Sequence, residues 1–273
     1  EATMARTLSV FFCCLLTNLF GPGITSDANG TAIDTTHIDY QRIWLLGDSL
    51  TQLAFSTEGC WATIVADHYS RKCDVLVRGF SGYNTRGGKY ILRRLFDRRD
   101  AQMVAAFVIM LGTNDSPTPQ NQGGAQLPLE EYIANLEEML DYLQDCGVPK
   151  SKIILATPPP LDQYKWSVHT GNVGRPTMLL ARVQKFAEAC LKIGVKHSVR
   201  TLNTFDGMLA EPNWRALFRD GVHFSAAGAK KFAQLLLPVL DEVLGNNTLV
   251  LPDFRDVTPS DPGREIYEWS AFQ

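Results

Sequence analysis

The sequence predicts an α/β fold in which a five-stranded parallel sheet carries helices on both of its faces. Three features predict it: short apolar runs, longer amphipathic segments, and the alternation of the two along the chain. Alternating strands and helices form parallel sheets, because each helix carries the chain back to the same end of the sheet. The chain has 273 residues, of which 45% are apolar, so it is long enough to bury one large core.

Five short runs are predicted to be buried strands. Each is apolar or β-branched and is bounded by Gly, Pro, Asn or Asp, as expected for a strand that is covered on both faces. These runs are residues 43–46, 75–77, 104–111, 153–156 and 199–202.

The longer segments between and after these strands are predicted to be helices with one apolar face. Three of them are residues 61–72, 129–146 and 177–193. Ser225 is expected to cap a last helix that runs toward Leu244, in which Pro238 either kinks the helix or ends its first part.

We therefore expect one domain over residues 40–248, followed by an irregular tail, residues 249–273, that packs on it. The chain has 26 basic and 29 acidic residues, a net charge of −3, and no long run of one sign. Nucleic-acid-binding proteins usually present a basic face, so this balance argues against that class.

Residues 1–26 are predicted to be a signal peptide or another N-terminal extension. A basic start at Arg6 precedes a mostly apolar run, residues 8–20, which is too short to span a bilayer comfortably. Two Asn-x-Thr sequons, at Asn29 and Asn246, favour a secreted glycoprotein. The expected location is the secretory pathway or the extracellular space, without an integral membrane segment, and the alternative is the cytoplasm.

Cysteine is left at four positions after the predicted signal peptide. Cys60 and Cys73 flank a predicted helix and would lie roughly 20 Å apart, far beyond the ~7 Å limit for a disulfide. Cys146 and Cys190 end successive predicted helices and could meet, so their pairing stays open. Because the sequence has no CxxC, HExxH or Cys/His cluster, we expect no metal site and no cofactor.

Polar blocks follow the predicted strands, at the edge of the sheet where ligands of open α/β folds collect. Each block alone has a structural explanation, because Gly-Asp-Ser is usual in a turn before a helix cap and a lone Asn or His often makes a structural hydrogen bond. Their joint occurrence where one fold would gather them favours a site. The blocks are residues 47–52, 78–85, 112–116, 157–160 and 220–224.

Ser49, His223 and Asp220 can supply the three parts of a serine nucleophile. A serine hydroxyl needs a neighbouring imidazole to take its proton, and a carboxylate fixes the tautomer of that imidazole. A negative oxygen then develops on the substrate and requires hydrogen-bond donors. The backbone N–H groups of Ser49 and Gly82 and the side-chain amide of Asn114 are the candidate donors, and losing one such donor typically costs about 3–4 kcal/mol of transition-state stabilisation.

The blocks resemble the SGNH (GDSL) hydrolase superfamily, since Gly47-Asp48-Ser49-Leu50, Gly82, Gly112-Thr113-Asn114-Asp115 and Asp220-x-x-His223 occur in its order. Residues 78–86, 157–160, 220–225 and 251–257 more narrowly resemble its isoamyl acetate-hydrolysing esterase branch. The resemblance implies a flavodoxin-like three-layer α/β/α sandwich and metal-independent hydrolysis of small carboxylic esters.

Carried over position by position, the resemblance makes Ser49 the nucleophile, His223 the base and Asp220 its orienting carboxylate, with Gly82 and Asn114 as oxyanion donors. Two features differ from that branch. Gly87-Gly88 stands where relatives often have bulkier residues, and the signal-like start is not typical of this branch. The branch is mostly intracellular, so the resemblance favours the cytoplasmic alternative.

These observations predict a serine esterase that acts on a small-molecule ester of the acetate type through an acyl-enzyme. One alternative is an acyltransferase or a lipid-directed enzyme of the lysophospholipase or thioesterase type on the same fold. The other is a non-catalytic binding protein, which would be expected to lack a catalytic residue. The sequence leaves the oligomeric state open, a homodimer included.

Overall fold

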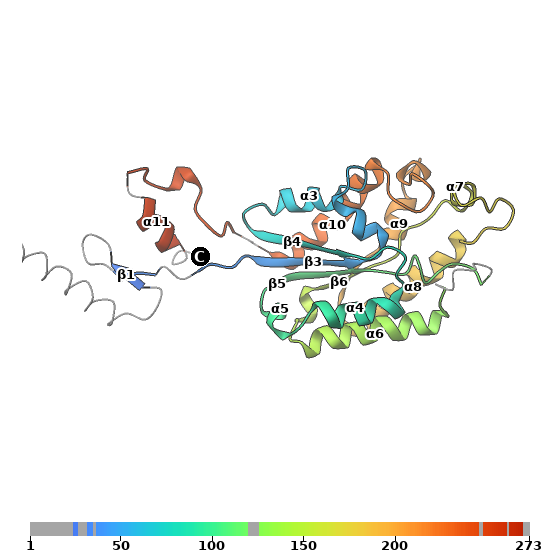
Figure 1. Cartoon of the computed structure of the whole chain (residues 1–273), viewed down its shortest axis with the longest axis horizontal. Helices are drawn as coiled ribbons and strands as arrows, with labels where there is room; N and C mark the ends of the chain where they lie inside the picture. Colours follow the sequence, from blue (N-terminus) through green and yellow to red (C-terminus); the bar gives the residue numbers. More distant parts are fainter. Residues whose placement is uncertain are drawn as a thin grey trace, which may run out of the picture. The chain divides into compact units, whose positions relative to one another are not determined.

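A five-stranded parallel sheet forms the centre of residues 41–246 in the computed structural model (Figure 1). The structure describes residues 24–26, 32–34, 37–119, 126–245, 248–260 and 262–269. The strands are β3 (Gln41–Gly47), β4 (Cys73–Gly79), β5 (Val104–Met110), β6 (Ile153–Ala156) and β7 (Arg200–Leu202). The predicted fold class is therefore confirmed, and each predicted strand lies in or next to an observed one.

The strand order is β4-β3-β5-β6-β7, with every neighbouring pair parallel. From β3 the chain passes first to the neighbour on one side, β4, and then to the neighbour on the other, β5. Such a reversal of direction opens a crevice at the carboxyl ends of the strands, where ligands of this fold class bind. The order is that of the flavodoxin-like fold, as the resemblance implied.

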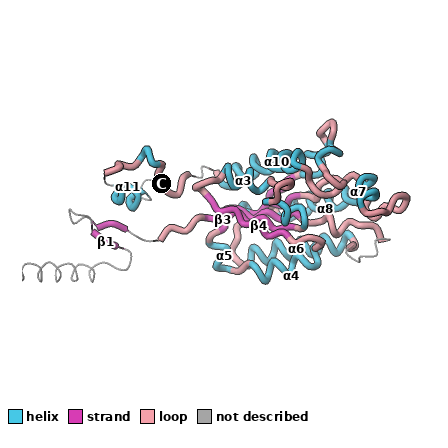
Figure 2. Tube along the Cα trace, turned by 45° about the horizontal axis from the view of Figure 1, so that its top comes forward, coloured by secondary structure: helices cyan, strands magenta, loops and turns pink. Residues whose placement is uncertain are grey.

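Helices cover both faces of the sheet and give three layers (Figures 1 and 2). On one face, α3 (Trp61–His68) and α10 (Ala226–Leu244) pack against Ile43, Leu45 and Val108. On the other face, the side chains of Trp44, Phe107 and Ile109 pack against three helices. These are α4 (Thr85–Leu95), α6 (Leu129–Asp145) and α8 (Leu180–His197).

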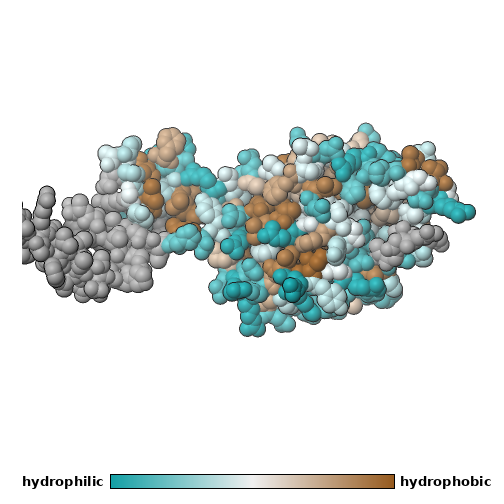
Figure 3. Space-filling view, viewed as in Figure 1, coloured by the Kyte–Doolittle hydropathy of each residue, from teal (hydrophilic) through white to brown (hydrophobic). Residues whose placement is uncertain are grey.

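Shorter elements complete this unit. The α-helices are α2 (Ser49–Gln52), α5 (Arg98–Gln102), α7 (Gln163–His169) and α9 (Thr204–Leu209). The 3-10 helices are η1 (Leu53–Phe55), η2 (Lys150–Lys152) and η3 (Trp214–Leu217). β4 is an edge strand with mostly half-buried residues, and Figure 3 shows apolar side chains reaching the surface at the level of the sheet, between more polar helical layers.

The last helix begins as predicted, because the Ser225 side chain accepts a hydrogen bond from the Gly228 N–H. The expectation that Pro238 ends the first part of this helix is wrong, since α10 continues to Leu244. Pro238 and Gln234, four residues earlier, are both exposed, so the proline interrupts the hydrogen bonding of the helix on its solvent side.

Neither Cys146 nor Cys190 forms a disulfide. The disulfide that the sequence left open is therefore not formed. Both side chains contribute to the same apolar cluster between the sheet and helices α6 and α8.

The terminal segments form a second, smaller unit. It contains an antiparallel pair of strands, β1 (Ile24–Ser26) and β2 (Ala32–Asp34), a 3-10 helix, η4 (Phe254–Asp256), and helix α11 (Pro262–Glu268). The tail that was expected to be irregular is thus partly helical, and its packing on the domain stays a prediction. Of the predicted signal peptide only residues 24–26 are described, and the sequons at Asn29 and Asn246 lie outside the described residues.

Candidate active site

Ser49, His223 and Asp220 meet at the carboxyl edge of the sheet. Ser49 begins α2 directly after β3, whereas the other two residues lie in the loop between η3 and α10. The Ser49 Oγ lies 2.9 Å from His223 Nε2, and His223 Nδ1 lies 2.7 Å from Asp220 Oδ2. The three side chains form one hydrogen-bonded chain, although 174 residues separate the serine from the histidine.

A tight turn after β3 presents the serine. The side chain of Asp48 accepts a hydrogen bond from the Leu50 N–H at 2.9 Å and thereby caps α2. Gly47 is required here, because a Cβ at this position would lie 2.2 Å from the Thr51 Oγ1 and 2.7 Å from the Met110 carbonyl oxygen. Ser49 is the first residue of the helix, and the first N–H groups of a helix have no intrahelical acceptor. Its backbone N–H therefore remains a candidate oxyanion donor.

Hydrogen bonds within the loop hold His223 in place. Asp220 Oδ1 accepts hydrogen bonds from the backbone N–H groups of Val222 at 2.9 Å and His223 at 2.8 Å, which leaves Oδ2 for the imidazole. Burial raises the pKa of Asp220, but the hydrogen bonds from the His223 side chain and from the two backbone N–H groups outweigh it and hold the pKa well below its usual range. A carboxylate that stays ionised fixes the Nδ1–H tautomer, so Nε2 can accept the serine proton.

Gly82 and Asn114 follow the two strands that flank β3. Gly82 has a φ of +78°, a conformation that glycine adopts readily, and the loop is tied to α2 because the Ser81 N–H donates to Gln52 Oε1 at 2.8 Å. The Asn114 side-chain amide donates to the Tyr83 carbonyl at 3.0 Å, which holds it against the same loop and leaves its second N–H for a ligand. The three predicted oxyanion donors thus come from the ends of three neighbouring strands.

A buried carboxylate that the sequence reasoning did not single out joins these loops. Asp115 accepts hydrogen bonds from the backbone N–H of Thr85 at 3.0 Å and from the Thr85 hydroxyl, so it anchors the start of α4 directly behind Asn114. The pKa of Asp115 is raised to about 7, mainly by burial. The hydrogen bonds from Thr85 oppose this rise, and the negative charge of Asp48 contributes to it. Burial likewise raises the pKa of Asp48 to about 6, and its Oδ2 has no hydrogen-bond partner among the described residues.

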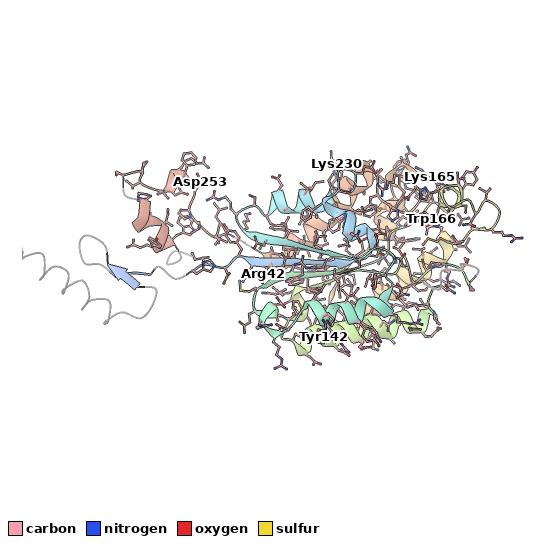
Figure 4. All side chains as sticks on the ribbon, viewed as in Figure 1. Arg42, Tyr142, Lys165, Trp166, Lys230 and Asp253 are labelled. Carbon is pink, nitrogen blue, oxygen red and sulfur yellow. The ribbon has the colours of Figure 1, made fainter. Side chains whose placement is uncertain are left out.

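Helix α7 lies over the histidine loop, and the sequence reasoning also missed it. The ring of Trp166 meets the His223 ring edge-on with the centroids 6.2 Å apart, and Lys165 Nζ donates to the Phe218 carbonyl at 2.6 Å. Figure 4 labels both α7 residues at the end of the domain where the strands terminate. Gly221, with a φ of +104°, permits this close packing, because a Cβ there would lie 2.5 Å from the Trp166 backbone nitrogen.

The remaining predicted block, residues 157–160, is buried. The Thr157 hydroxyl accepts a hydrogen bond from the Phe205 N–H at 3.0 Å, which gives this block a structural contact. Within the ranges that the structure describes, no group of three or more His, Cys, Asp or Glu side chains is arranged to hold a metal ion. The helices of those ranges are all too short or too polar to cross a membrane.

Comparison with known proteins agrees with this geometry. The sequence model of the GDSL-like Lipase/Acylhydrolase family matches residues 45–231, which include the whole hydrogen-bonded chain. The chain belongs to the GDSL-like lipase/acylhydrolase family. As a member, it is a carboxylic ester hydrolase, and its curated relatives carry esterase names.

Two relatives show how far this GDSL hydrolase resembles named proteins. The isoamyl acetate-hydrolyzing esterase 1 homolog of Rattus norvegicus is 37% identical over 227 residues, which are 82% of this chain and 90% of the relative. A GDSL esterase/lipase of Arabidopsis thaliana is 32% identical over 84% of this chain and 99% of its own length.

A solved structure supports the fold. The lipase/acylhydrolase from Enterococcus faecalis superposes with a TM-score of 0.60 at 21% identity, covering 78% of this chain and all of that one. At this identity the likeness concerns the fold alone, and it agrees with the strand order described above.

Proposed function

We propose that this GDSL hydrolase cleaves small carboxylic esters of the acetate type through a covalent acyl-enzyme on Ser49. The observation that carries the proposal is the unbroken hydrogen-bonded chain from the Ser49 Oγ through His223 to Asp220. This order of groups is the one that an activated serine requires: a hydroxyl nucleophile, an imidazole base, and a carboxylate that fixes the tautomer of the imidazole.

In the first half of the reaction Ser49 Oγ attacks the ester carbonyl carbon while His223 Nε2 takes the hydroxyl proton. The carbonyl oxygen becomes an oxyanion and receives hydrogen bonds from the N–H groups of Ser49 and Gly82 and from Asn114. His223 then gives its proton to the leaving alcohol oxygen as the C–O bond breaks. The acyl group remains on Ser49, and the alcohol departs.

In the second half water takes the place of the alcohol. His223 Nε2 removes a proton from the water as its oxygen attacks the acyl carbon, and the same donors hold the second oxyanion. His223 then returns the proton to Ser49 Oγ, and the free acid leaves. Asp220 stays ionised throughout and stabilises the imidazolium that forms in each half.

The acetate-type substrate is supported by the relatives. Four mammalian proteins, 35% to 37% identical to this chain, are named isoamyl acetate-hydrolyzing esterase 1 homologs, and the chain covers 90% of the length of each. A small acyl group and an apolar alcohol are the chemistry that those names imply for this chain.

Turnover of a chromogenic acetate ester tests the proposal. Ser49→Ala should lose at least about a thousandfold in kcat, since a nucleophile and its base act as one unit. Ser70→Ala is the matched control, because Ser70 lies in an exposed turn after α3 and should keep full activity. Equal turnover by Ser49→Ala and the unchanged protein would overturn the mechanism, and an acylated alcohol as the main product would make the protein an acyltransferase instead.

We further infer secretion from the basic start and apolar run of residues 1–26. Expression in a eukaryotic host followed by mass spectrometry of the mature N-terminus should find cleavage close to Ser26. An intact N-terminus on intracellular protein would favour the cytoplasmic alternative.

A further inference from the structure

An ion pair joins the turn before α3 to the loop that carries the base. Glu58 lies in this turn, between η1 and α3, and η1 follows α2, the helix that Ser49 begins. Arg219 immediately precedes Asp220. The Arg219 Nη1 bonds to the Glu58 carboxylate. The ion pair therefore connects two residues that are 161 positions apart in the sequence. The segments that it connects adjoin Ser49 and His223, whose side chains must stay within hydrogen-bond distance of each other.

Arg219 also faces the catalytic carboxylate. Its Nε lies 3.9 Å from Asp220 Oδ2, the same oxygen that accepts the hydrogen bond from His223 Nδ1. The backbone N–H of Arg219 donates to the His223 carbonyl at 2.8 Å, so the arginine is fixed within the loop that it serves. One guanidinium thus stands between two carboxylates, with the closer contact to Glu58.

A small cavity of about 10 Å³ lies beside this pair, lined by Leu50, Leu53, Ser56, Gly59, Arg219 and Phe224. Leu50 and Phe224 also belong to one buried apolar cluster. The ion pair therefore adds a polar connection at the edge of the apolar contact between these segments.

We propose that Glu58 and Arg219 form a positioning pair for the base. The pair ties the Asp220–His223 loop to the segment that follows α2, the helix of the nucleophile, and it places two opposite charges beside Asp220. Glu58 keeps the guanidinium at a distance from Asp220 Oδ2 and so reserves that oxygen for His223. This inference rests on the proposed acyl-enzyme mechanism.

The other charged groups around the imidazole are unchanged in every variant below. Asp48 faces His223 from the nucleophile's turn, and Lys165 on α7 is occupied by the Phe218 carbonyl. His169 stacks near Trp166, and Arg215 Nε lies 3.6 Å from Asp162 Oδ2 at the start of α7. Differences between variants therefore report the ion pair alone.

The two single variants should move the acid limb of the kcat/KM profile, which reports the essential base of the free enzyme, in opposite directions. Arg219→Gln removes a positive charge near the imidazole, so the charged imidazole becomes easier to form and the limb moves to higher pH by about half a unit. Glu58→Gln leaves Arg219 with Asp220 as its nearer carboxylate. The limb then moves to lower pH by a similar amount, and kcat falls severalfold because Asp220 is shared.

A second ion pair provides a matched control. Arg200 and Glu242 also make a close contact, with side chains 40% and 64% exposed, against 38% and 61% for Arg219 and Glu58. Arg200→Gln and Glu242→Gln remove the same charges outside the site, and they should leave the limb and kcat unchanged. Arg219→Lys keeps the charge and should restore most of the limb position, which a purely structural role for the arginine would not predict.

Covalent labelling of Ser49 by a fluorophosphonate separates this inference from the proposed function. The labelling rate should follow the same shifted pH profiles without any ester substrate. Absence of label at Ser49 in the unchanged protein would defeat the proposed function. Label at Ser49 with acid limbs that coincide in Glu58→Gln, Arg219→Gln and the unchanged protein, or that move in one direction in both variants, would defeat the positioning pair alone.

Discussion

Replacing Asp220 by asparagine tests the orienting role that we propose for its carboxylate. In Asp220→Asn the side-chain oxygen can still accept from the backbone N–H groups of Val222 and His223, so the loop keeps two of its three hydrogen bonds to this residue. The new NH₂ group then faces His223 Nδ1. Two donors cannot share a hydrogen bond, so the ring adopts the tautomer with its proton on Nε2, and Nε2 no longer accepts the Ser49 proton.

The size of the effect follows from losing the base while keeping the fold. The wrong tautomer in a serine–histidine–aspartate arrangement lowers kcat by about 10⁴-fold, which corresponds to about 5 kcal/mol of transition-state stabilisation. The change in KM should be small, because Asp220 is largely buried and its contacts are to the loop and the imidazole. Unfolding stability should fall as well, because the neutral amide loses one charge-assisted hydrogen bond and turns the two from backbone N–H groups into neutral ones.

Steady-state hydrolysis of a soluble acetate ester, with thermal unfolding measured on the same samples, provides the assay. Asp241→Asn is the control, because Asp241 also accepts hydrogen bonds from a histidine, His68 at 2.9 Å, and from Tyr69 at 2.7 Å, outside the site. The control should retain full kcat. A folded Asp220→Asn protein with kcat within tenfold of the unchanged enzyme would refute the assignment of Asp220 as the orienting carboxylate.

Three further predictions follow from the described contacts. Asn114→Ala removes one of the proposed oxyanion donors and should lower kcat by about 10²–10³ with little change in KM. An unchanged kcat in the same ester assay would remove Asn114 from the oxyanion site. Gly221→Ala places a Cβ 2.5 Å from the Asp162 carbonyl oxygen at a φ of +104°, so it should lower both the unfolding midpoint and kcat, whereas Gly171→Ala, with open space around it, should leave kcat unchanged. Folding raises the pKa of Asp48 from 3.8 to about 6, mainly through burial. Ionisation of this carboxylate therefore opposes folding, and the cost grows as the pH rises from about 4 to about 6. At about 1.4 kcal/mol for each pH unit, Asp48→Asn should be up to about 3 kcal/mol more stable than the unchanged protein at pH 8, and denaturant unfolding should show this advantage vanishing near pH 4.

The sequence predicted the sheet well because its central strands are apolar on both faces. Residues 104–111 and 153–156 are continuous apolar runs, and they form the buried strands β5 and β6. The edge strand β4 was predicted too short, since its ladder with β3 extends to the polar residues Asp74 and Arg78, which an apolar pattern does not include.

Helix α4 illustrates what the sequence pattern concealed. Gly87 and Gly88 weaken a helix prediction, yet both allow close packing, because a Cβ at Gly88 would lie 2.8 Å from Leu111 Cδ1 and one at Gly87 would lie 2.5 Å from the Tyr83 ring. The start of the helix also depends on Asp115, which lies 30 residues from Thr85 in the sequence. Such long-range contacts are not visible in a local pattern.

The sequence named the residues of the candidate site but not the residues that hold them in place. The named residues stand in blocks whose order is informative by itself: Ser49, Gly82, Asn114, Asp220 and His223. The residues that contact them lie in elements whose sequence gives no comparable pattern. Helix α7 has exposed apolar residues, Tyr164 and Val168, in place of an inward apolar stripe, and only the folded chain shows Trp166 against the imidazole.

Detection of the proposed acyl-enzyme on Ser49 is the most direct test of the mechanism. The protein is mixed with an activated acetate ester, quenched in acid within the first turnovers, digested, and analysed by peptide mass spectrometry. We expect the peptide that contains Ser49 to gain the mass of one acetyl group, and this gain to disappear as the ester is exhausted. Acetylation at another residue that rises and falls with turnover, with Ser49 unmodified, would contradict the account.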